Sequence, residues 1–174
     1  LKNALWEFKK QGVERILCLG DLVDTDDTAE QNAENLRRAA SLLAETGLPC
    51  CCCMGNHDAA LFSKNEFANL TGFTLAPAVI KAENAALILL DANFNLDGSP
   101  YEPGKVNWTE TVISQAQILW LKQTLADCRG LDVYVFIHQN LDPAVDTSHV
   151  VQNAAEVNRI LADGGNVRAV YQGH

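Results

Sequence analysis

The residues best suited to chemistry lie in the stretch Gly55-Asn56-His57-Asp58, directly after the apolar run 49–54. Asn56 offers a neutral oxygen, His57 a ring nitrogen that can coordinate or carry a proton, and Asp58 a negative charge. An apolar run closed by glycine is typical of a buried parallel strand, and ligands bind at the carboxyl ends of such strands. The stretch therefore predicts a strand followed by a tight polar turn that can bind a hard cation and move a proton beside it.

Three other apolar runs end in polar residues of the same kinds. The run 15–19 is followed by Gly20, Asp21 and Asp24, the run 133–137 by His138, and the run 167–171 by Gly173 and His174. Because ligands bind where strand ends converge, the four ends predict one shared site of carboxylate, amide and imidazole groups. The alternative is a set of unrelated caps, and Asp24 in particular could simply cap its own loop.

The segments around these strand ends have the spacing of helices or of further strands. Helical patterns cover residues 1–8, 29–46, 63–70, 114–128 and 153–162, and short strand patterns cover residues 78–81 and 85–90. Strand, helix and strand over residues 15–54 predict a βαβ unit with a right-handed crossover. This connection places Asp21 and Asn56 at the same edge of one parallel sheet.

Residues 92–112 contain two glycines and two prolines and have no clear period. A loop of this length is usually functional or mobile, and it could form a lid over the site. Asn93 and Tyr101, together with Phe94 and Trp108, are the candidates for substrate contacts. The alternative is a loop packed by its own aromatic side chains.

Three other polar residues are expected to serve the structure or the surface. Asp58 is expected to brace its turn, and Asp91, at a strand end, to make a structural hydrogen bond. His149 precedes a predicted helix, where it could approach a substrate, but a place on the solvated surface is the preferred interpretation.

The composition limits the classes of protein that fit. A chain of 174 residues with 48% hydrophobic content predicts one compact domain, residues 1–174. Thirteen Lys and Arg against 22 Asp and Glu give a formal charge of −9 without a basic block, which disfavours binding of free nucleic acid. No apolar stretch is long enough to span a bilayer, so no membrane partner is expected.

The six cysteines are predicted to be free and buried. Four are consecutive, Cys50 to Cys53, so neighbouring side chains would point to opposite faces of a strand and could not form a disulfide framework. They also lack the separated pairs of a structural zinc site. Free buried thiols favour a reducing, cytoplasmic location.

The order Gly-Asp-x-x-Asp, Gly-Asn-His-Asp, strand-end His and Gly-His resembles the calcineurin-like metallophosphoesterases over nearly the whole chain. The resemblance implies an α/β fold, an αββα sandwich of two mixed sheets flanked by helices, with two divalent metal ions (Mn, Fe, Zn or Ni) between the sheet ends. It also implies that Asp21 bridges both ions and that Asn56, His138 and His174 complete one of the two metal sites.

The same resemblance implies hydrolysis of phosphomonoesters, phosphodiesters or nucleotide diphosphates through a metal-bound hydroxide, with a small phosphoester or nucleotide as substrate. His57 resembles the proton donor to the leaving oxygen, and Asp24 resembles the residue that orients its imidazole.

The chain departs from the family pattern at both ends. The family opens with a strand ending in Asp-x-His and finishes with Gly-His-x-His, whereas this sequence starts after the first motif and stops at His174. We therefore expect one complete metal site, a second site that retains only Asp21, a gap in the sheet and poor activity of this stretch by itself. The alternative function is a non-catalytic metal-binding or protein-interaction module with the same fold. A Rossmann-like nucleotide binder is disfavoured because no G-x-G-x-x-G follows any strand.

Overall fold

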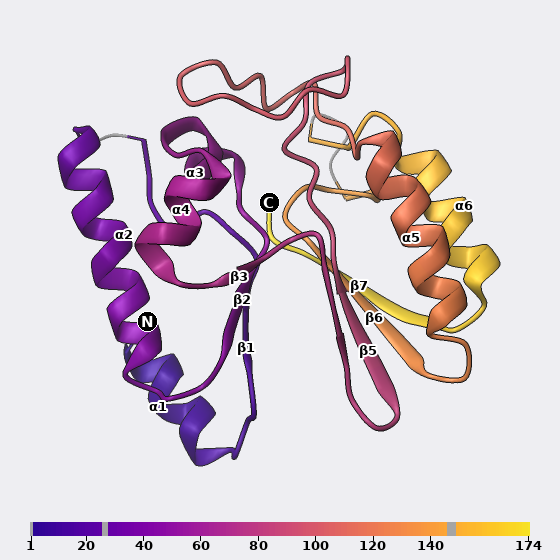
Figure 1. Cartoon of the computed structure of the whole chain (residues 1–174), viewed down its shortest axis with the longest axis horizontal. Coiled ribbons are helices and arrows are strands. Elements are labelled where there is room, and N and C mark those ends of the chain that lie inside the picture. The colour runs from indigo at the N-terminus through magenta and orange to yellow at the C-terminus, as the bar shows by residue number, and fades with distance from the viewer. Residues whose placement is uncertain (1, 26–27, 146–148) are drawn as a thin grey trace.

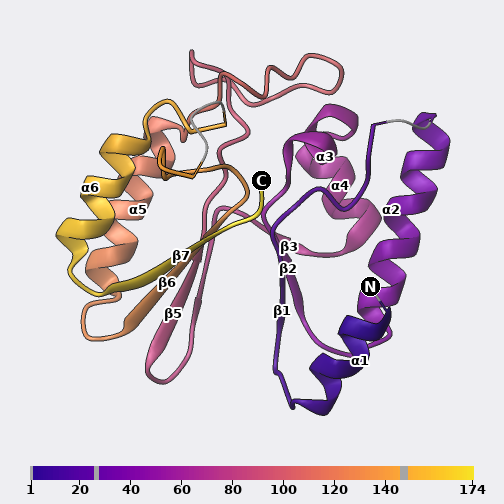
Figure 2. The same cartoon turned by 180° about the vertical axis from the view of Figure 1, so that it is seen from behind.

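The computed structural model describes residues 2–25, 28–145 and 149–174. The elements in this part of the chain are α1 (Lys2–Lys10), β1 (Ile16–Cys18), α2 (Ala29–Ala44), β2 (Cys50–Cys52), α3 (Asn56–Leu61), α4 (Lys64–Thr71), β3 (Thr74–Leu75), β4 (Ala78–Lys81), β5 (Ala85–Leu89), α5 (Gln115–Asp127), β6 (Asp132–Ile137), α6 (Ala154–Gly164) and β7 (Val167–Gln172). Two layers of strands lie inside, with α1, α2 and α4 covering one and α5 and α6 covering the other (Figure 1; Figure 2). This arrangement confirms the predicted αββα sandwich.

The strands β1, β2 and β3 form a parallel sheet in that order. The chain crosses from β1 to β2 through α2, which begins after the N-cap residue Thr28. The side of α2 that packs in the core carries Leu36, Ala40 and Leu43. The predicted βαβ unit is therefore confirmed, and it sets the ends of β1 and β2 side by side, with Cys18 opposite Cys52.

The other sheet has the order β4-β5-β6-β7, in which β4 is antiparallel to β5 and the remaining pairs are parallel. Inward and outward residues alternate along β6, and Val133, Val135 and Ile137 are fully buried against side chains of α5 and α6. None of the helices in the described residues has the length and apolar character needed to cross a bilayer.

A small hydrophobic cluster lies where the two sheets meet. The buried members of this cluster are Cys51, Cys53, Ala76 and Leu89. Among the described residues, β1 is hydrogen-bonded to β2 alone and β7 to β6 alone, so each has one edge without a strand partner there.

The stretch after β2 corrects the prediction of a tight turn, because Asn56 instead begins the helix α3. Gly55 precedes the helix in an extended conformation, and the Asp58 carboxylate accepts a hydrogen bond from the Gly55 N–H at 3.0 Å. Gly, Asn and Asp are turn formers, but they are also favoured at helix N-termini, where an acidic side chain interacts well with the helix dipole. The sequence pattern could not separate these two uses.

All six cysteines are free, as predicted, but only four of them are buried, because Cys18 and Cys50 are partly exposed. Burial raises the pKa of Cys18 and Cys53 to about 12, and it also raises the pKa of Cys50 and Cys52. Because the thiolate is the reactive form, a three-unit rise slows the reaction of a thiol about 1000-fold at neutral pH. We expect Ellman's reagent to react slowly with the native protein and rapidly with six thiols after unfolding. Rapid modification of Cys18 or Cys53 in the folded state would contradict this prediction.

Candidate metal centre

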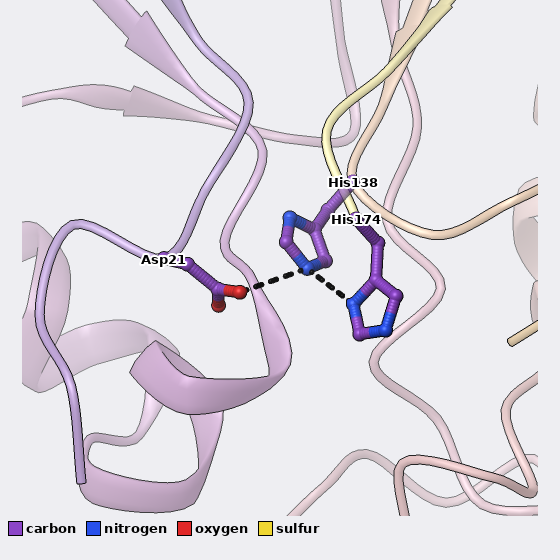
Figure 3. A group of neighbouring side chains, drawn as sticks. All are labelled: Asp21, His138 and His174. Atoms are coloured by element: carbon purple, nitrogen blue, oxygen red, sulfur yellow. Dashed lines mark hydrogen bonds and ion pairs between the residues drawn. The ribbon is translucent and has the colours of Figure 1, made fainter. Parts of the chain in front are cut away.

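Four strand ends bring their polar side chains to one point where the sheets meet. Asp21 follows β1, Asn56 follows β2, His138 follows β6 and His174 follows β7. The Nε2 atom of His138 lies 3.0 Å from Nδ1 of His174 and 3.4 Å from Oδ2 of Asp21 (Figure 3). The same atom lies 3.1 Å from Oδ1 of Asn56. Candidate ligand atoms of Asp21, His138 and His174 all lie within 4.8 Å of one another. The structure thus brings together the four residues that the sequence assigned to one metal site, called the ligand cluster below.

The hydrogen bonding of His138 determines which of its ring nitrogens can bind a cation. Its Nδ1 lies 2.5 Å from the carbonyl oxygen of Leu19, which can only accept, so Nδ1 carries the proton. Nε2 then directs its lone pair toward the amide oxygen of Asn56 and the carboxylate of Asp21. Converging lone pairs repel one another unless a positive charge lies among them. The ligand cluster therefore fits a divalent ion that accepts imidazole and oxygen ligands, such as Mn, Fe, Zn or Ni.

Both imidazoles of the ligand cluster favour the neutral form that a metal requires. Burial lowers the pKa of His138, which is 1% exposed, although the Asp21 carboxylate opposes this effect. Burial also lowers the pKa of His174, and the neighbouring His138 and His149 lower it further. Because only the unprotonated nitrogen can coordinate, little free energy is needed to remove protons when a metal binds near neutral pH.

The carboxylate of Asp58 holds the backbone that carries Asp21. It is fully buried and accepts hydrogen bonds from the N–H groups of Asp21 at 2.8 Å, Leu22 at 3.0 Å and Gly55 at 3.0 Å. Asp21 itself has a positive φ of 52°, which is uncommon for a non-glycine residue. Its Oδ1 accepts the His57 N–H at 3.1 Å, and its Oδ2 faces His138. Asp58 thus braces this junction, as the sequence indicated.

Two glycines allow the ends of β1 and β2 to touch. A Cβ atom on Gly55 would lie 2.5 Å from the backbone nitrogen of Asp21, and a Cβ on Gly20 would lie 2.7 Å from the carbonyl oxygen of Cys53. Gly20 also has a φ of +95°, which L-residues rarely adopt. Glycine at both positions therefore lets the two backbones come close enough for the side chains of Asp21 and Asn56 to share one site.

The predicted pair of His57 and Asp24 lies beside the ligand cluster. Nδ1 of His57 is 3.1 Å from Oδ1 of Asp24, and the two side chains are 39% and 69% exposed. A pair so accessible to water contributes little to stability. Its geometry suits the orientation of one imidazole by one carboxylate, which is the role expected of Asp24.

A cavity of about 430 Å³ opens next to the ligand cluster. Its lining residues are Thr25, Asn56, His57, Ala60, Val106, Trp108, His149 and His174. Of the loop residues expected to contact substrate, Trp108 lines this cavity. The volume lies within the usual range for small-molecule sites.

Asn93 and Tyr101, which were also predicted to contact substrate, do not line this cavity. Both line a separate cavity of about 70 Å³, and both are buried. The Asn93 amide donates to the carbonyl of Met54 at 2.8 Å and accepts from Gln139 at 2.8 Å, while the Tyr101 hydroxyl donates to the carbonyl of Asn107 at 2.9 Å. Their polar groups are thus engaged in holding the loop, which no local sequence pattern could show.

His149 is the residue of the cavity wall that the sequence interpretation placed on the solvated surface. Its ring stacks on the Trp108 indole with 4.7 Å between centroids and 13° between planes. Its centroid is also 4.5 Å from that of His174. The sequence left open that His149 could approach a substrate, but it could not decide this, because the approach depends on how two distant loops fold together.

Comparisons with curated proteins identify related phosphodiesterases. The chain is 28% identical over 187 residues to a protein of Psychrobacter arcticus described as "Probable cyclic nucleotide phosphodiesterase", in a match that covers 100% of this chain and 60% of that protein. It is also 28% identical over 159 residues to the 3',5'-cyclic adenosine monophosphate phosphodiesterase CpdA of Escherichia coli, over 88% of this chain and 53% of CpdA. The chain thus spans a little more than half the length of these relatives.

Solved structures share the fold at low sequence identity. A dimetal phosphatase from Danio rerio superposes with a TM-score of 0.80 at 18% identity, over 97% of this chain and 68% of that one. The structure of TT1561 from Thermus thermophilus gives a TM-score of 0.62 at 13% identity, over 97% and 73% of the two chains. The sequence profile of the family described as "Calcineurin-like phosphoesterase" matches residues 1–174. The chain therefore belongs to the calcineurin-like phosphoesterase family.

Proposed function

We propose that this protein is a metal-dependent phosphoesterase that hydrolyses phosphodiesters, with cyclic nucleotides among its substrates. The observation that carries the proposal is the convergence of the ligand cluster beside His57, at one side of the 430 Å³ cavity. Family membership and the names of the two bacterial phosphodiesterases support the choice of phosphodiesters.

The proposed roles follow from the donor groups. Asp21, Asn56, His138 and His174 would hold one divalent ion, and Asp21 would be shared with a second ion. Bound divalent ions acidify water and neutralise the charge of phosphoryl oxygens. With Nδ1 of His57 engaged by Asp24, Nε2 is the nitrogen left to give a proton to the departing oxygen. The Asp24 carboxylate would hold the His57 imidazole in the orientation that this transfer requires.

The test is turnover by the full-length protein supplied with Mn²⁺. We expect hydrolysis of bis-p-nitrophenyl phosphate and of 3',5'-cyclic AMP, both abolished by a chelator and restored by added metal. Stoichiometric metal binding without cleavage of any phosphoester would overturn the proposal and favour the non-catalytic binding module.

Replacement of His57 with alanine is expected to have an effect that depends on the leaving group. A p-nitrophenolate leaves without a proton, so its release should slow little, whereas an alkoxide needs one, so its release should slow about 100- to 10,000-fold. The measurement is kcat for two phosphodiesters that differ only in the leaving group, which is an aryl oxide in one and an alkoxide in the other. Asp24→Asn, which keeps the shape and removes the charge, should show the same pattern more weakly. Equal losses on both esters would mean that His57 gives no proton to the leaving group.

A further inference from the structure

We propose that Trp108 and His149 form an aromatic wall that binds the planar base of a nucleoside phosphodiester. This inference rests on the proposed phosphodiesterase function. The wall lies in the same cavity as the groups assigned to phosphate chemistry. Besides the wall, the cavity is lined by Asn56, His57 and His174 and by Thr25, Ala60 and Val106.

The indole of Trp108 is positioned for a stacking contact. One face is covered by the His149 ring, with 13° between the planes, yet the side chain remains 43% exposed. Part of the Trp108 surface in the cavity is therefore still open to a ligand. A large aromatic side chain left open to water inside a cavity is the usual feature of a site for a flat apolar group.

The wall is tied to the ligand cluster through ring contacts. The centroid of the His174 ring lies 4.5 Å from that of His149 and 6.3 Å from that of Trp108. His174 also contacts His138 through Nδ1 at 3.0 Å. A ligand that places its phosphate at the cluster can therefore reach the wall with an adjoining ring.

The loop that carries Trp108 is held in place before any ligand binds. The buried Tyr101 hydroxyl donates to the Asn107 carbonyl at 2.9 Å, and the Asn107 side chain donates to Glu110 at 2.9 Å. The Gly104 N–H donates to the carbonyl of Ala60 on α3 at 2.9 Å, which fixes the loop to the helix that begins with Asn56. Tyr101 is thus a positioning residue for the wall. A fixed wall loses less conformational entropy on binding than a mobile one.

The charge of the cavity narrows the substrate class. Among the described residues that line it, none is Lys or Arg. Nucleotide diphosphates carry several negative charges and are usually held by such residues, whereas a phosphodiester carries one. The cavity therefore fits a nucleoside phosphodiester better than a nucleotide diphosphate.

The test compares two substrates that differ only in the base. The substrates are 3',5'-cyclic AMP and ribose 3',5'-cyclic phosphate without a base, each with the Mn²⁺-loaded full-length protein. For Trp108→Ala we expect KM for cyclic AMP to rise about 10- to 100-fold with kcat nearly unchanged, because base–aromatic stacking is lost. KM for the base-free substrate should not change, and Trp108→Phe should retain most of the wild-type affinity. Equal changes with both substrates, or none with cyclic AMP, would overturn the proposal.

Two control variants separate base stacking from a general effect of the loop and from metal binding. Leu96→Ala removes another exposed apolar side chain of the same loop, 56% exposed and outside the cavity lining, and should leave KM for cyclic AMP unchanged. His149→Phe removes both ring nitrogens and should leave the Mn²⁺ content unchanged, because His149 is assigned to the wall and not to the ligand cluster. Loss of Mn²⁺ from this variant would make His149 a metal ligand and overturn its place in the wall.

A binding measurement keeps the test independent of turnover. If the protein cleaves no phosphodiester, the proposed function fails, but the wall can still be tested by calorimetry with AMP and ribose 5-phosphate. Weaker binding of AMP by Trp108→Ala, with binding of ribose 5-phosphate unchanged, would support the wall. Identical AMP affinity in the wild type and the variant would overturn it.

Discussion

Replacing His138 with asparagine will abolish metal binding at the ligand cluster while leaving the fold intact. The Nε2 atom of His138 lies within 3.4 Å of candidate ligand atoms of the three other members, Asp21, Asn56 and His174. Loss of an outer partner of a ligand typically weakens metal affinity 10- to 100-fold, so loss of this ligand should weaken it by more than about 100-fold. Calorimetry with Mn²⁺ on chelator-treated protein measures the change.

Asparagine is the informative substitution because it removes a metal ligand without removing the hydrogen bond that stabilises the fold. Its amide nitrogen can occupy the place of Nδ1 and still donate to the carbonyl of Leu19, a bond that ties the end of β6 to the end of β1. The variant has no atom at the place of Nε2. We therefore expect a thermal unfolding midpoint close to that of the metal-free wild type. An alanine at this position would confuse the result, since it would also leave a cavity at a site that is 1% exposed.

The same substitution at His57 provides the matched control. His57 lies next to the ligand Asn56 in sequence, but its Nδ1 pairs with Asp24 and it is not assigned to the ligand cluster. His57→Asn should therefore keep Mn²⁺ affinity within a few-fold of the wild type. If His138→Asn binds Mn²⁺ as tightly as His57→Asn, His138 is not a metal ligand.

The strands that carry the ligand cluster could be predicted because the local sequence of each one is enough to identify it as a strand. Each is a short apolar run that stops at glycine or at a polar residue, and the right-handed crossover fixes the edge at which Asp21 and Asn56 meet. The glycines that precede Asp21 and Asn56 are needed for backbone contact between these ends. The sequence therefore predicts the structure best where one backbone requirement, here the close approach of two strand ends, restricts the choice of several residues.

Trp108 was predicted as a substrate contact, but its pairing with His149 could not be predicted because it depends on contacts between distant loops. Trp108 and His149 are 41 positions apart in the sequence, and no periodic element holds either one. Tyr101 and Asn93 have the residue types of substrate contacts, but their polar groups are satisfied within the protein. Residue type shows what a side chain can bind, whereas the neighbours that it meets in the folded chain decide what it does bind.

Replacing Asp58 with alanine will strongly destabilise the protein. The substitution removes the acceptor of three backbone N–H groups, those of Asp21, Leu22 and Gly55, at a fully buried position. Each buried donor left without a partner costs about 1–3 kcal/mol, although partial relaxation makes the sum smaller than three separate losses. We expect the free energy of unfolding to fall by about 3–5 kcal/mol, measured by urea denaturation with a chelator present. Asp97→Ala, at an exposed loop carboxylate, should leave the denaturation midpoint nearly unchanged.

The Asp58 carboxyl should also give the metal-free protein a characteristic pH dependence. Burial raises its pKa from 3.8 to about 6; the Gly55, Asp21 and Leu22 N–H groups oppose this rise and the Asp21 charge adds to it. Between these two pH values the folded state holds a proton that the unfolded chain has released. The contribution of Asp58 to stability is therefore fully present below about pH 4 and is lost as the pH rises through about 6, by about 3 kcal/mol in total.

Asp58→Asn isolates this titration because asparagine keeps the shape of the side chain and cannot ionise. Its amide nitrogen must face at least one backbone N–H group, so the variant should be less stable than the wild type below about pH 4. As the pH rises through about 6, the wild type loses the contribution of Asp58 and the variant does not, so the difference between their free energies of unfolding should shrink. A difference that grows with pH would instead mean that the three N–H groups outweigh burial and hold the carboxylate ionised throughout.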